Sequence, residues 1–286
     1  MIELAAGDYR LVLDPGRGGS VARFDWRGEP LFRPTCGPSI LDTACFPLVP
    51  FSNRIADGRF EADGSVVRIS PNMPGSDHPH PLHGFGWLAP WDVIENDGAS
   101  AVMVHRYPGG EWPWPYQATQ RVSLSEAGLS MTIGVRNDGP TPMPAGVGFH
   151  PYLPRNAVTL YRGAHRGEWR NSPDGIPAAL DERPEAIDWW QGAPVGARTV
   201  DTLYTDRSGG LRIAWPDRGM ALEIQPSPGL PHTVVYAPAG ADFVCIEPVS
   251  HMTDAVNRPG QDTGLRWLGP GENLCAGMEL TGIAGQ

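Results

Sequence analysis

The stretch LSMTIGVR at residues 129–136 decides the fold class, because its apolar residues occupy every second position. A period of two is typical of a β-strand that has one face in the core and the other in solvent. The same alternation recurs at residues 9–14, 211–215 and 220–225. These stretches predict antiparallel strands.

Glycine and proline punctuate the chain, with 36 glycines and 31 prolines among 286 residues. This density interrupts helices too often for a helical bundle and suits short strands joined by turns. Glycine ends the turn motifs at residues 96–98, 126–128, 137–139 and 217–219, where a hairpin commonly needs a positive φ. Only residues 184–191, which follow a proline start, have the pattern of a short helix.

The alternation runs through the chain without a break in composition or a repeat of fixed period. We therefore predict an all-β fold in which residues 1–286 form a single domain, a large antiparallel β-sandwich with few short helices. A barrel or a jelly roll is the neighbouring alternative. The aromatic, proline-rich residues 112–116 are expected to form an ordered loop that packs on the sheet or lines a cleft.

Charge and composition exclude several classes of function. The formal net charge of −10 repels nucleic acid and anionic membranes unless basic residues cluster, and no such cluster occurs. No stretch reaches the roughly 18 apolar residues of a transmembrane helix, and the N-terminus lacks a signal-peptide pattern. We expect a cytoplasmic protein without nucleic-acid or membrane partners. The four cysteines show no CxxC spacing, which favours buried reduced thiols over a zinc or redox motif.

Three clustered histidines, His78, His80 and His83, have the spacing of a cupin-type metal site. Two features weaken this interpretation. Prolines place the histidines on a loop, and no carboxylate follows before Asp92. We therefore expect no metal, with His78 and His80 in a solvated loop and His83 in a functional site.

His150 and Glu247 are candidates for proton transfer, since each ends an apolar run and precedes a proline. Glutamate is rarely fully buried unless it is paired or functional, which makes Glu247 an unusual acid. Asn53 and Arg54 follow another apolar run, and an amide beside a guanidinium suits vicinal hydroxyl groups.

With these residues in view, the chain resembles the aldose 1-epimerase (galactose mutarotase) family over nearly its whole length. The resemblance depends on the order and spacing of six motifs: NRI at 53–55, PLHGF at 81–85, GFHPY at 148–152, VDTLY at 200–204, EP at 247–248 and LGPGE at 268–272. It implies a large antiparallel β-sandwich, no cofactor, and interconversion of the α and β anomers of free aldoses.

The resemblance also implies roles for individual residues. Glu247 matches the general base of the family and His150 its general acid. His83, Arg54 and Asp201 match sugar-binding positions, although Asp206 lies close enough in sequence to compete with Asp201. Asn53, beside Arg54, is expected to bind the sugar as well, and the protein is expected to be a monomer or a homodimer.

The chemistry fits these residue types. Mutarotation removes the O1 proton while the ring oxygen is protonated, so a carboxylate and an imidazole suffice at neutral pH. If the two groups form an ion pair, each stabilises the charge of the other, and the alkaline limb of activity is expected above the usual histidine pKa of about 6.5.

Two other functions stay open from the sequence. One is a non-catalytic carbohydrate-binding or sensor protein that keeps aromatics such as Trp87, Trp112 and Trp114. The other is an epimerase of sugar 6-phosphates, which calls for an arginine-rich pocket, whereas Arg54 is the only arginine in a matched motif.

Overall fold

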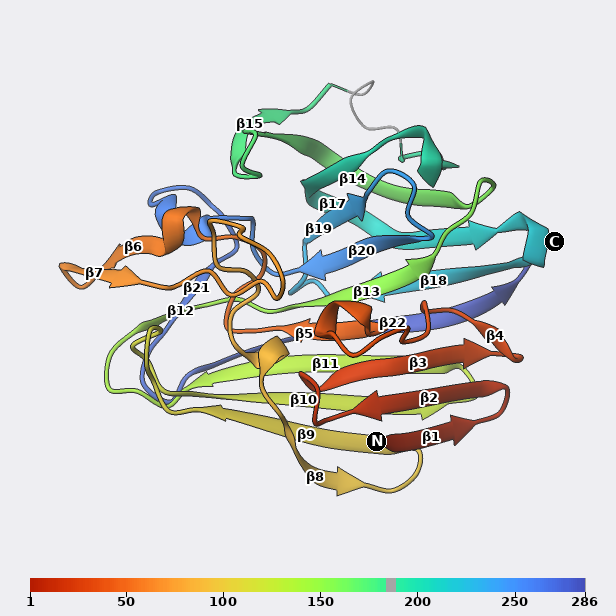
Figure 1. Ribbon diagram of the computed structural model, residues 1–286, viewed down its shortest axis with the longest axis horizontal. Helices are drawn as coiled ribbons and strands as arrows, with labels where there is room; N and C mark the ends of the chain where they lie inside the picture. The colour runs from red at the N-terminus through yellow and green to blue at the C-terminus, as the bar shows by residue number, and fades with distance from the viewer. Residues whose placement is uncertain (184–188, 286) are drawn as a thin grey trace.

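Alternating apolar residues build one large antiparallel sheet in the computed structural model, which describes residues 1–183 and 189–285 (Figure 1). The strands of this sheet are β1 (Ile2–Ala6), β2 (Tyr9–Asp14), β3 (Ser20–Trp26), β4 (Glu29–Pro30), β5 (Cys45–Leu48), β8 (Asp92–Asn96), β9 (Ser100–Tyr107), β10 (Tyr116–Ser125), β11 (Gly128–Asn137), β13 (Gly148–Pro154), β14 (Leu160–Asn171), β15 (Pro177–Asp181), β16 (Ala193–Pro194), β17 (Val200–Trp215), β18 (Met220–Pro226), β19 (His232–Ala237), β20 (Phe243–Val249) and β22 (Asn273–Ala284). Two small ribbons flank it, β6 (Arg59–Ala62) with β7 (Ser65–Arg68) and β12 (Met143–Ala145) with β21 (Arg266–Leu268). The predicted all-β class is confirmed.

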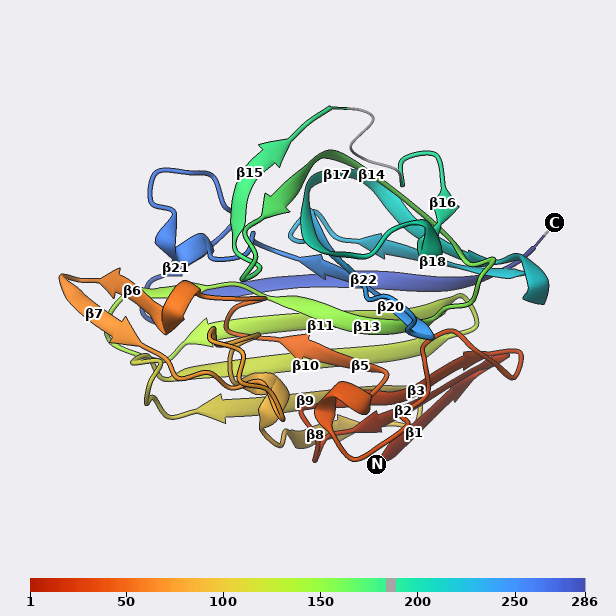
Figure 2. The same ribbon diagram turned by 45° about the horizontal axis from the view of Figure 1, so that its top comes forward.

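Strand pairing follows one continuous path through the sheet. From β8 the neighbours are β9, β10, β11, β22, β18, β17, β19, β20, β13, β5, β3, β2 and β1, all antiparallel. β14 pairs with β17 and also with β15 and β16. Figure 2 shows the strands spread from β8 and β9 on one side of the molecule to β14 and β15 on the other.

The long strand β17 is the turning point that makes two layers from this single sheet. Its C-terminal part pairs with β18, and its N-terminal part pairs with β19. Side chains from both arms, such as Phe24 on β3 and Ile133 on β11, share one buried core. The predicted sandwich is therefore a sheet that curls on itself.

The four alternating stretches all lie in strands. Residues 129–136 lie within β11, and residues 9–14 form β2. Residues 211–215 and 220–225 lie in β17 and β18. Glycine is required at the β10–β11 turn, because Gly128 has φ 142° and a Cβ there would lie 2.2 Å from the carbonyl oxygen of Leu280.

Helical structure in the described residues is limited to single 3₁₀ turns. They are η1 (Ile40–Asp42), η2 (Ala56–Gly58), η3 (Gly86–Leu88), η5 (Val195–Ala197), η6 (Pro216–Arg218) and η7 (Ala255–Asn257). Of the predicted helix at 184–191, residues 184–188 lie outside the described residues, and residues 189–191 form a turn. No helix in the described part of the chain has the length and apolar character that a membrane crossing requires.

Candidate functional site

The register of the central strands brings His150 and Glu247 together. On β13 and β20, Gly148 pairs with Val249 and Tyr152 with Cys245, so His150 lies opposite Glu247 between these pairs. A proline follows each of the two residues and has no N–H to donate to the ladder. The His-Pro and Glu-Pro dipeptides of the sequence are thus cross-strand neighbours.

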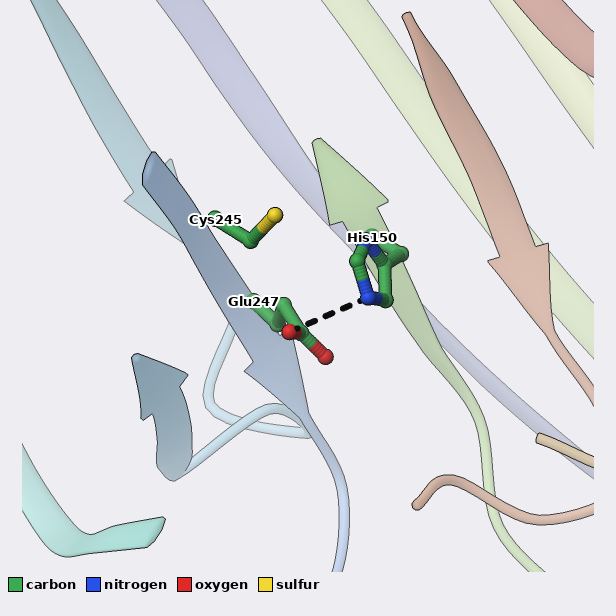
Figure 3. A group of neighbouring side chains, drawn as sticks. All are labelled: His150, Cys245 and Glu247. Carbon is green, nitrogen blue, oxygen red and sulfur yellow. Dashed lines mark ion pairs between the residues drawn. The ribbon is translucent and has the colours of Figure 1, made fainter. Parts of the chain in front are cut away.

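The two side chains are in direct contact (Figure 3). Nε2 of His150 lies 3.2 Å from Oε1 of Glu247, and the side chains are 8% and 2% exposed. The ring of Phe46, from the neighbouring strand β5, stacks on the imidazole at 4.4 Å. Oε2 of Glu247 is buried and has no hydrogen-bond partner among the described residues. Glu247 borders the pocket described below, so a ligand there can supply the missing partner.

Burial sets the protonation of this pair. It lowers the pKa of His150 to about 3, against a small opposing effect of its own backbone. Burial, with the nearby Asp201 carboxylate, raises the pKa of Glu247 well above its usual range. The cost of burying two charges outweighs the attraction that we expected from an ion pair. Both shifts favour a proton on Glu247 and a neutral imidazole over the pair of charged groups expected from the sequence.

His83 presents a hydrogen-bond donor rather than an acid. Its backbone N–H donates to the carbonyl of Asn53, and the N–H of Asn53 donates back to His83 Nδ1, at 3.0 and 3.1 Å. Burial, followed by the charges of His150 and Arg54, lowers the pKa of His83 well below its usual value. The neutral ring therefore carries its proton on Nε2.

Arg54 is held by three acceptors. Its Nη2 donates to Asp201 Oδ2 at 2.8 Å, its Nη1 to Asn53 Oδ1 at 3.1 Å and its Nε to His78 Nε2 at 3.1 Å. Asn53 Oδ1 also accepts from the backbone N–H of Arg54 at 2.9 Å. Asn53 and His78 thus orient the guanidinium, and Asp201 forms an ion pair with it.

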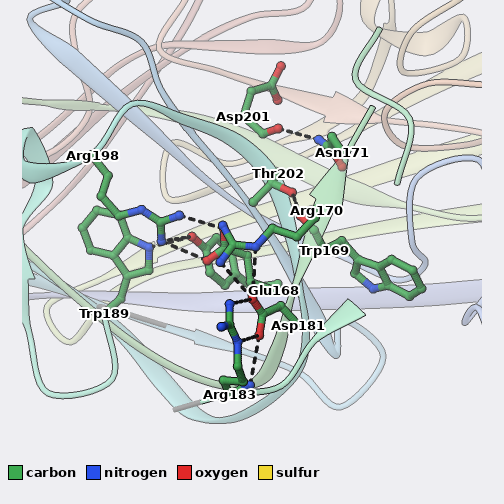
Figure 4. Close-up of polar contacts among 11 residues, drawn as sticks. Glu168, Trp169, Arg170, Asn171, Asp181, Arg183, Trp189, Arg198, Asp201 and Thr202 are labelled. Atoms are coloured by element: carbon green, nitrogen blue, oxygen red, sulfur yellow. Dashed lines mark hydrogen bonds and ion pairs between the residues drawn. The ribbon is translucent and has the colours of Figure 1, made fainter. Parts of the chain in front are cut away.

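Asp201 is fixed from the β14 side (Figure 4). Asn171 donates to the backbone carbonyl of Asp201 at 2.7 Å, and Thr202 donates to the carbonyl of Trp169. Further along β14, the buried Glu168 accepts two hydrogen bonds from Arg198, at 2.9 and 2.7 Å. These contacts hold the N-terminal end of β17, and with it Asp201, against β14.

These side chains line one pocket of about 280 Å³. Asn53, Arg54, His83, His150, Asp201 and Glu247, the six residues predicted from the sequence, all border it. Asp206, the sequence competitor of Asp201, instead pairs with Arg166 at 3.1 Å and does not line the pocket. The volume lies just below the usual range of ligand pockets, about 300–1,000 Å³, and suits a small ligand.

The histidine loop is built differently from the expectation. His80 is buried rather than solvated, and its Nδ1 accepts from the backbone N–H of Asp57 at 2.9 Å. His78 and His83 each accept a protein hydrogen bond through one ring nitrogen, from Arg54 and Asn53. Each of the three imidazoles therefore uses a ring nitrogen to accept a hydrogen bond from the protein. They do not form a group of convergent metal ligands among the described residues.

The aromatic residues singled out in the sequence are buried. Trp112 and Trp114 are buried in the main core, so the loop at 112–116 packs inside the protein. Trp87 borders the pocket, but its Nε1–H donates to backbone carbonyls and the ring is fully buried. Sequence reasoning missed Tyr236, which lines the pocket beside Asp201 because the two residues pair across β17 and β19. Only the strand register reveals that neighbour.

Comparisons with known proteins show the family to which the chain belongs. The family model described as "Aldose 1-epimerase" matches residues 1–281. The uncharacterized protein YphB of Escherichia coli (strain K12) is 31% identical over 280 residues, which cover 94% of this chain and 95% of that protein. Among solved structures, a putative aldose 1-epimerase from Escherichia coli K12 superposes with a TM-score of 0.91 at 30% identity, covering 99% of this chain and 98% of the other. A galactose mutarotase-like protein from Clostridium acetobutylicum has the same fold, with a TM-score of 0.88 at 19% identity over 99% and 94% of the two chains. The chain therefore belongs to the aldose 1-epimerase family.

Proposed function

We propose that this protein is a mutarotase that interconverts the α and β anomers of a free aldose. The observation that carries the proposal is the direct contact of His150 with Glu247, at 3.2 Å, on the floor of a small pocket. An imidazole and a carboxyl group in reach of one small ligand are the two groups that ring opening needs.

The reaction proceeds by two coupled proton transfers. For ring opening, ionised Glu247 accepts the O1 proton and protonated His150 donates to the ring oxygen, which breaks the bond between C1 and that oxygen. The C1–C2 bond of the aldehyde then rotates. Ring closure reverses both transfers, so neutral Glu247 donates to O1 and neutral His150 accepts from the chain hydroxyl.

One proton is conserved on the pair throughout this cycle. The charged and neutral forms differ only by a proton shift across the 3.2 Å contact. The neutral form favoured by burial is the one that closes the ring. Binding of a cyclic sugar must therefore shift the pair to its charged form. Oε2 of Glu247, which no described residue contacts by a hydrogen bond, is available to receive O1–H.

The other pocket residues position the sugar. Arg54 and Asp201 offer a donor and an acceptor for neighbouring hydroxyl groups, and the Nε2–H of His83 offers another donor. Among the described residues, Arg54 is the one arginine that borders the pocket, and its ion pair with Asp201 offsets its charge. This supports an unphosphorylated aldose, because a 6-phosphate would need further cationic groups.

An anomerisation assay tests the proposal. Freshly dissolved α-D-glucose, α-D-galactose, pentoses and the corresponding 6-phosphates are followed by polarimetry or NMR, with and without protein. We expect acceleration for at least one free aldose. Sugar binding without acceleration would favour a non-catalytic sensor, and acceleration of 6-phosphates alone would contradict the assignment of the substrate class.

A further inference from the structure

Cys245 lies beside the His150–Glu247 pair and has no part in the proposed reaction. It precedes Glu247 by two residues on β20, so both side chains point to the same face of the sheet. Its neighbour across the strands is Tyr152, which borders the pocket. Figure 3 shows the thiol, the imidazole and the carboxyl group gathered between the two strands.

The donor atoms of these three side chains converge. One ligand atom from each lies within 4.8 Å of the others, and all three residues are buried. Oε2 of Glu247, whose side chain is 2% exposed, has no hydrogen-bond partner in the part of the chain that the structure describes. The group therefore offers a soft sulfur, an imidazole nitrogen and a carboxylate oxygen next to the pocket. The carboxylate is the group whose second oxygen lacks a hydrogen-bond partner among the described residues.

We propose that His150, Cys245 and Glu247 form a binding site for a thiophilic divalent cation such as Zn²⁺, which blocks the floor of the pocket. Zinc accepts these three donor types, with bonds of about 2.0–2.3 Å, and a tetrahedral ion holds its donors roughly 3.3–3.8 Å apart. The contact between His150 and Glu247 is already 3.2 Å, so the main adjustment is an approach of the thiol. The fourth position faces the pocket and takes water.

Charge balance favours this occupant in a buried site. Coordination releases the thiol proton and the carboxyl proton to solvent, leaving a thiolate, a carboxylate and a neutral imidazole. These charges sum to zero with a divalent ion, so the loaded site places no net charge in the apolar surroundings. The cation is an inhibitor in this proposal, because it occupies both proton-transfer groups. Inhibition, unlike binding, depends on the proposed function.

Cys45 provides a matched control on β5, the strand that pairs with β13. It adjoins Phe46 on β5, whose ring stacks on His150, so alternation turns the Cys45 side chain to the opposite face. Consistently, Cys45 packs in the main core, whereas Phe46 and Cys245 pack in the cluster beneath the pocket. The exposed thiols of Cys36 and Cys275 can be removed by serine substitution.

The experiment titrates metal-free protein carrying Cys36→Ser and Cys275→Ser with Zn²⁺ by calorimetry and with Co²⁺ by absorption spectroscopy. We expect one equivalent bound and a thiolate-to-cobalt charge-transfer band in the near ultraviolet. Adding Cys245→Ser or Cys245→Ala should abolish the band and weaken zinc binding at least tenfold, while Cys45→Ala keeps both. Zinc should also inhibit anomerisation in the background protein, whereas each Cys245 variant, compared with its own metal-free rate, should resist that inhibition.

The proposal is overturned if the background protein binds no stoichiometric zinc, or if the charge-transfer band survives in both Cys245 variants. The zinc stoichiometry is measured on protein with the native site, so this criterion does not depend on the folding of a Cys245 variant. If the band is present but the metal-free protein anomerises no sugar, the proposed function fails and the cation site stands.

Discussion

His150 and Glu247 face each other across adjacent antiparallel strands, with Nε2 and Oε1 3.2 Å apart. Their positions are tied to the backbone of the sheet rather than to mobile loops. An acid and a base fixed in this way need little reorganisation during the reaction, which is the condition for efficient proton transfer.

Replacing Glu247 by glutamine should remove the base while keeping a side chain of the same shape. We expect Glu247→Gln to lower kcat by about 10²-fold or more, with little change in sugar binding. Polarimetry on a fresh anomer measures the rate, and calorimetry measures the affinity. The control Glu223→Gln alters an exposed acid on β18 and should leave both unchanged. Near wild-type turnover of Glu247→Gln would refute the role of the base.

The pH dependence should follow the pKa shifts of the buried pair. The active pair holds one proton, so activity falls on the acid side when His150, with a pKa of about 3, takes a second. Activity falls on the alkaline side when Glu247, whose pKa is raised by burial, loses the one proton that the pair holds. We therefore expect kcat/KM to stay level across mildly acidic and neutral pH, with an alkaline limb that belongs to Glu247.

His150→Asn separates this assignment from the simple ion-pair view. Without the imidazole, the proton of Glu247 must leave before the carboxylate can accept O1–H, so the residual activity of the variant should rise with pH through the raised pKa of Glu247. The ion-pair view predicts instead that the limb disappears with the imidazole. A flat alkaline profile in His150→Asn would show that the limb reports His150.

The sequence predicted the strands and the chemical groups because both leave local traces. Alternation reveals which face of β11 is buried, and a glutamate at the end of an apolar run reveals Glu247. Partners across the sheet leave no such trace. The position of Tyr236 beside Asp201 depends on the pairing of β17 with β19, which is a property of the whole topology.

The effect of burial on the charges of His150 and Glu247 could not be predicted from the sequence either. Residue types alone suggest that a carboxylate and an imidazolium stabilise each other, whereas the stacked Phe46 and the surrounding strands exclude the water that such charges require. The same limit applies to His80, whose burial depends on the loop folding back onto the backbone of Asp57.

Removing metals should leave the reaction intact. The proposed mechanism moves protons between the sugar, Glu247 and His150 and needs no Lewis acid. Protein dialysed against EDTA and returned to metal-free buffer should keep its full anomerisation rate. An activity that is lost with EDTA and restored by one equivalent of zinc, iron or manganese would contradict the mechanism and also the inhibitory role of the cation.

Acid should destabilise the fold through buried neutral histidines. His251 accepts from the Ser52 N–H at 3.0 Å and its Nδ1–H donates to the carbonyl of Met252 at 2.7 Å, so a second ring proton would face the N–H of Ser52. Burial lowers its pKa to about 4. Because the unfolded pKa of histidine is higher, about 6.5, the unfolded chain binds more protons between these values, and stability falls as the pH drops through them.

Each such group contributes about 1.4 kcal/mol per unit of pKa shift. Denaturant unfolding at pH 7.5, 6 and 5 should show a steady loss of stability, and His251→Gln should reduce the slope even though the variant is less stable at pH 7.5. Stability that is constant over this range in the wild-type protein would contradict the prediction.

His78 should affect substrate affinity and leave the chemical step unchanged. It contacts Arg54 at 3.1 Å and does not touch the acid–base pair, so it positions the guanidinium. His78→Leu removes an acceptor from a charged donor, a loss of about 1.5 kcal/mol, which predicts a KM about tenfold higher with kcat within about twofold. His78→Gln can place its amide oxygen near the position of Nε2 and should restore most of the affinity. A fall in kcat at constant KM, or a glutamine variant as poor as the leucine variant, would show that the hydrogen bond to Arg54 is not what His78 contributes.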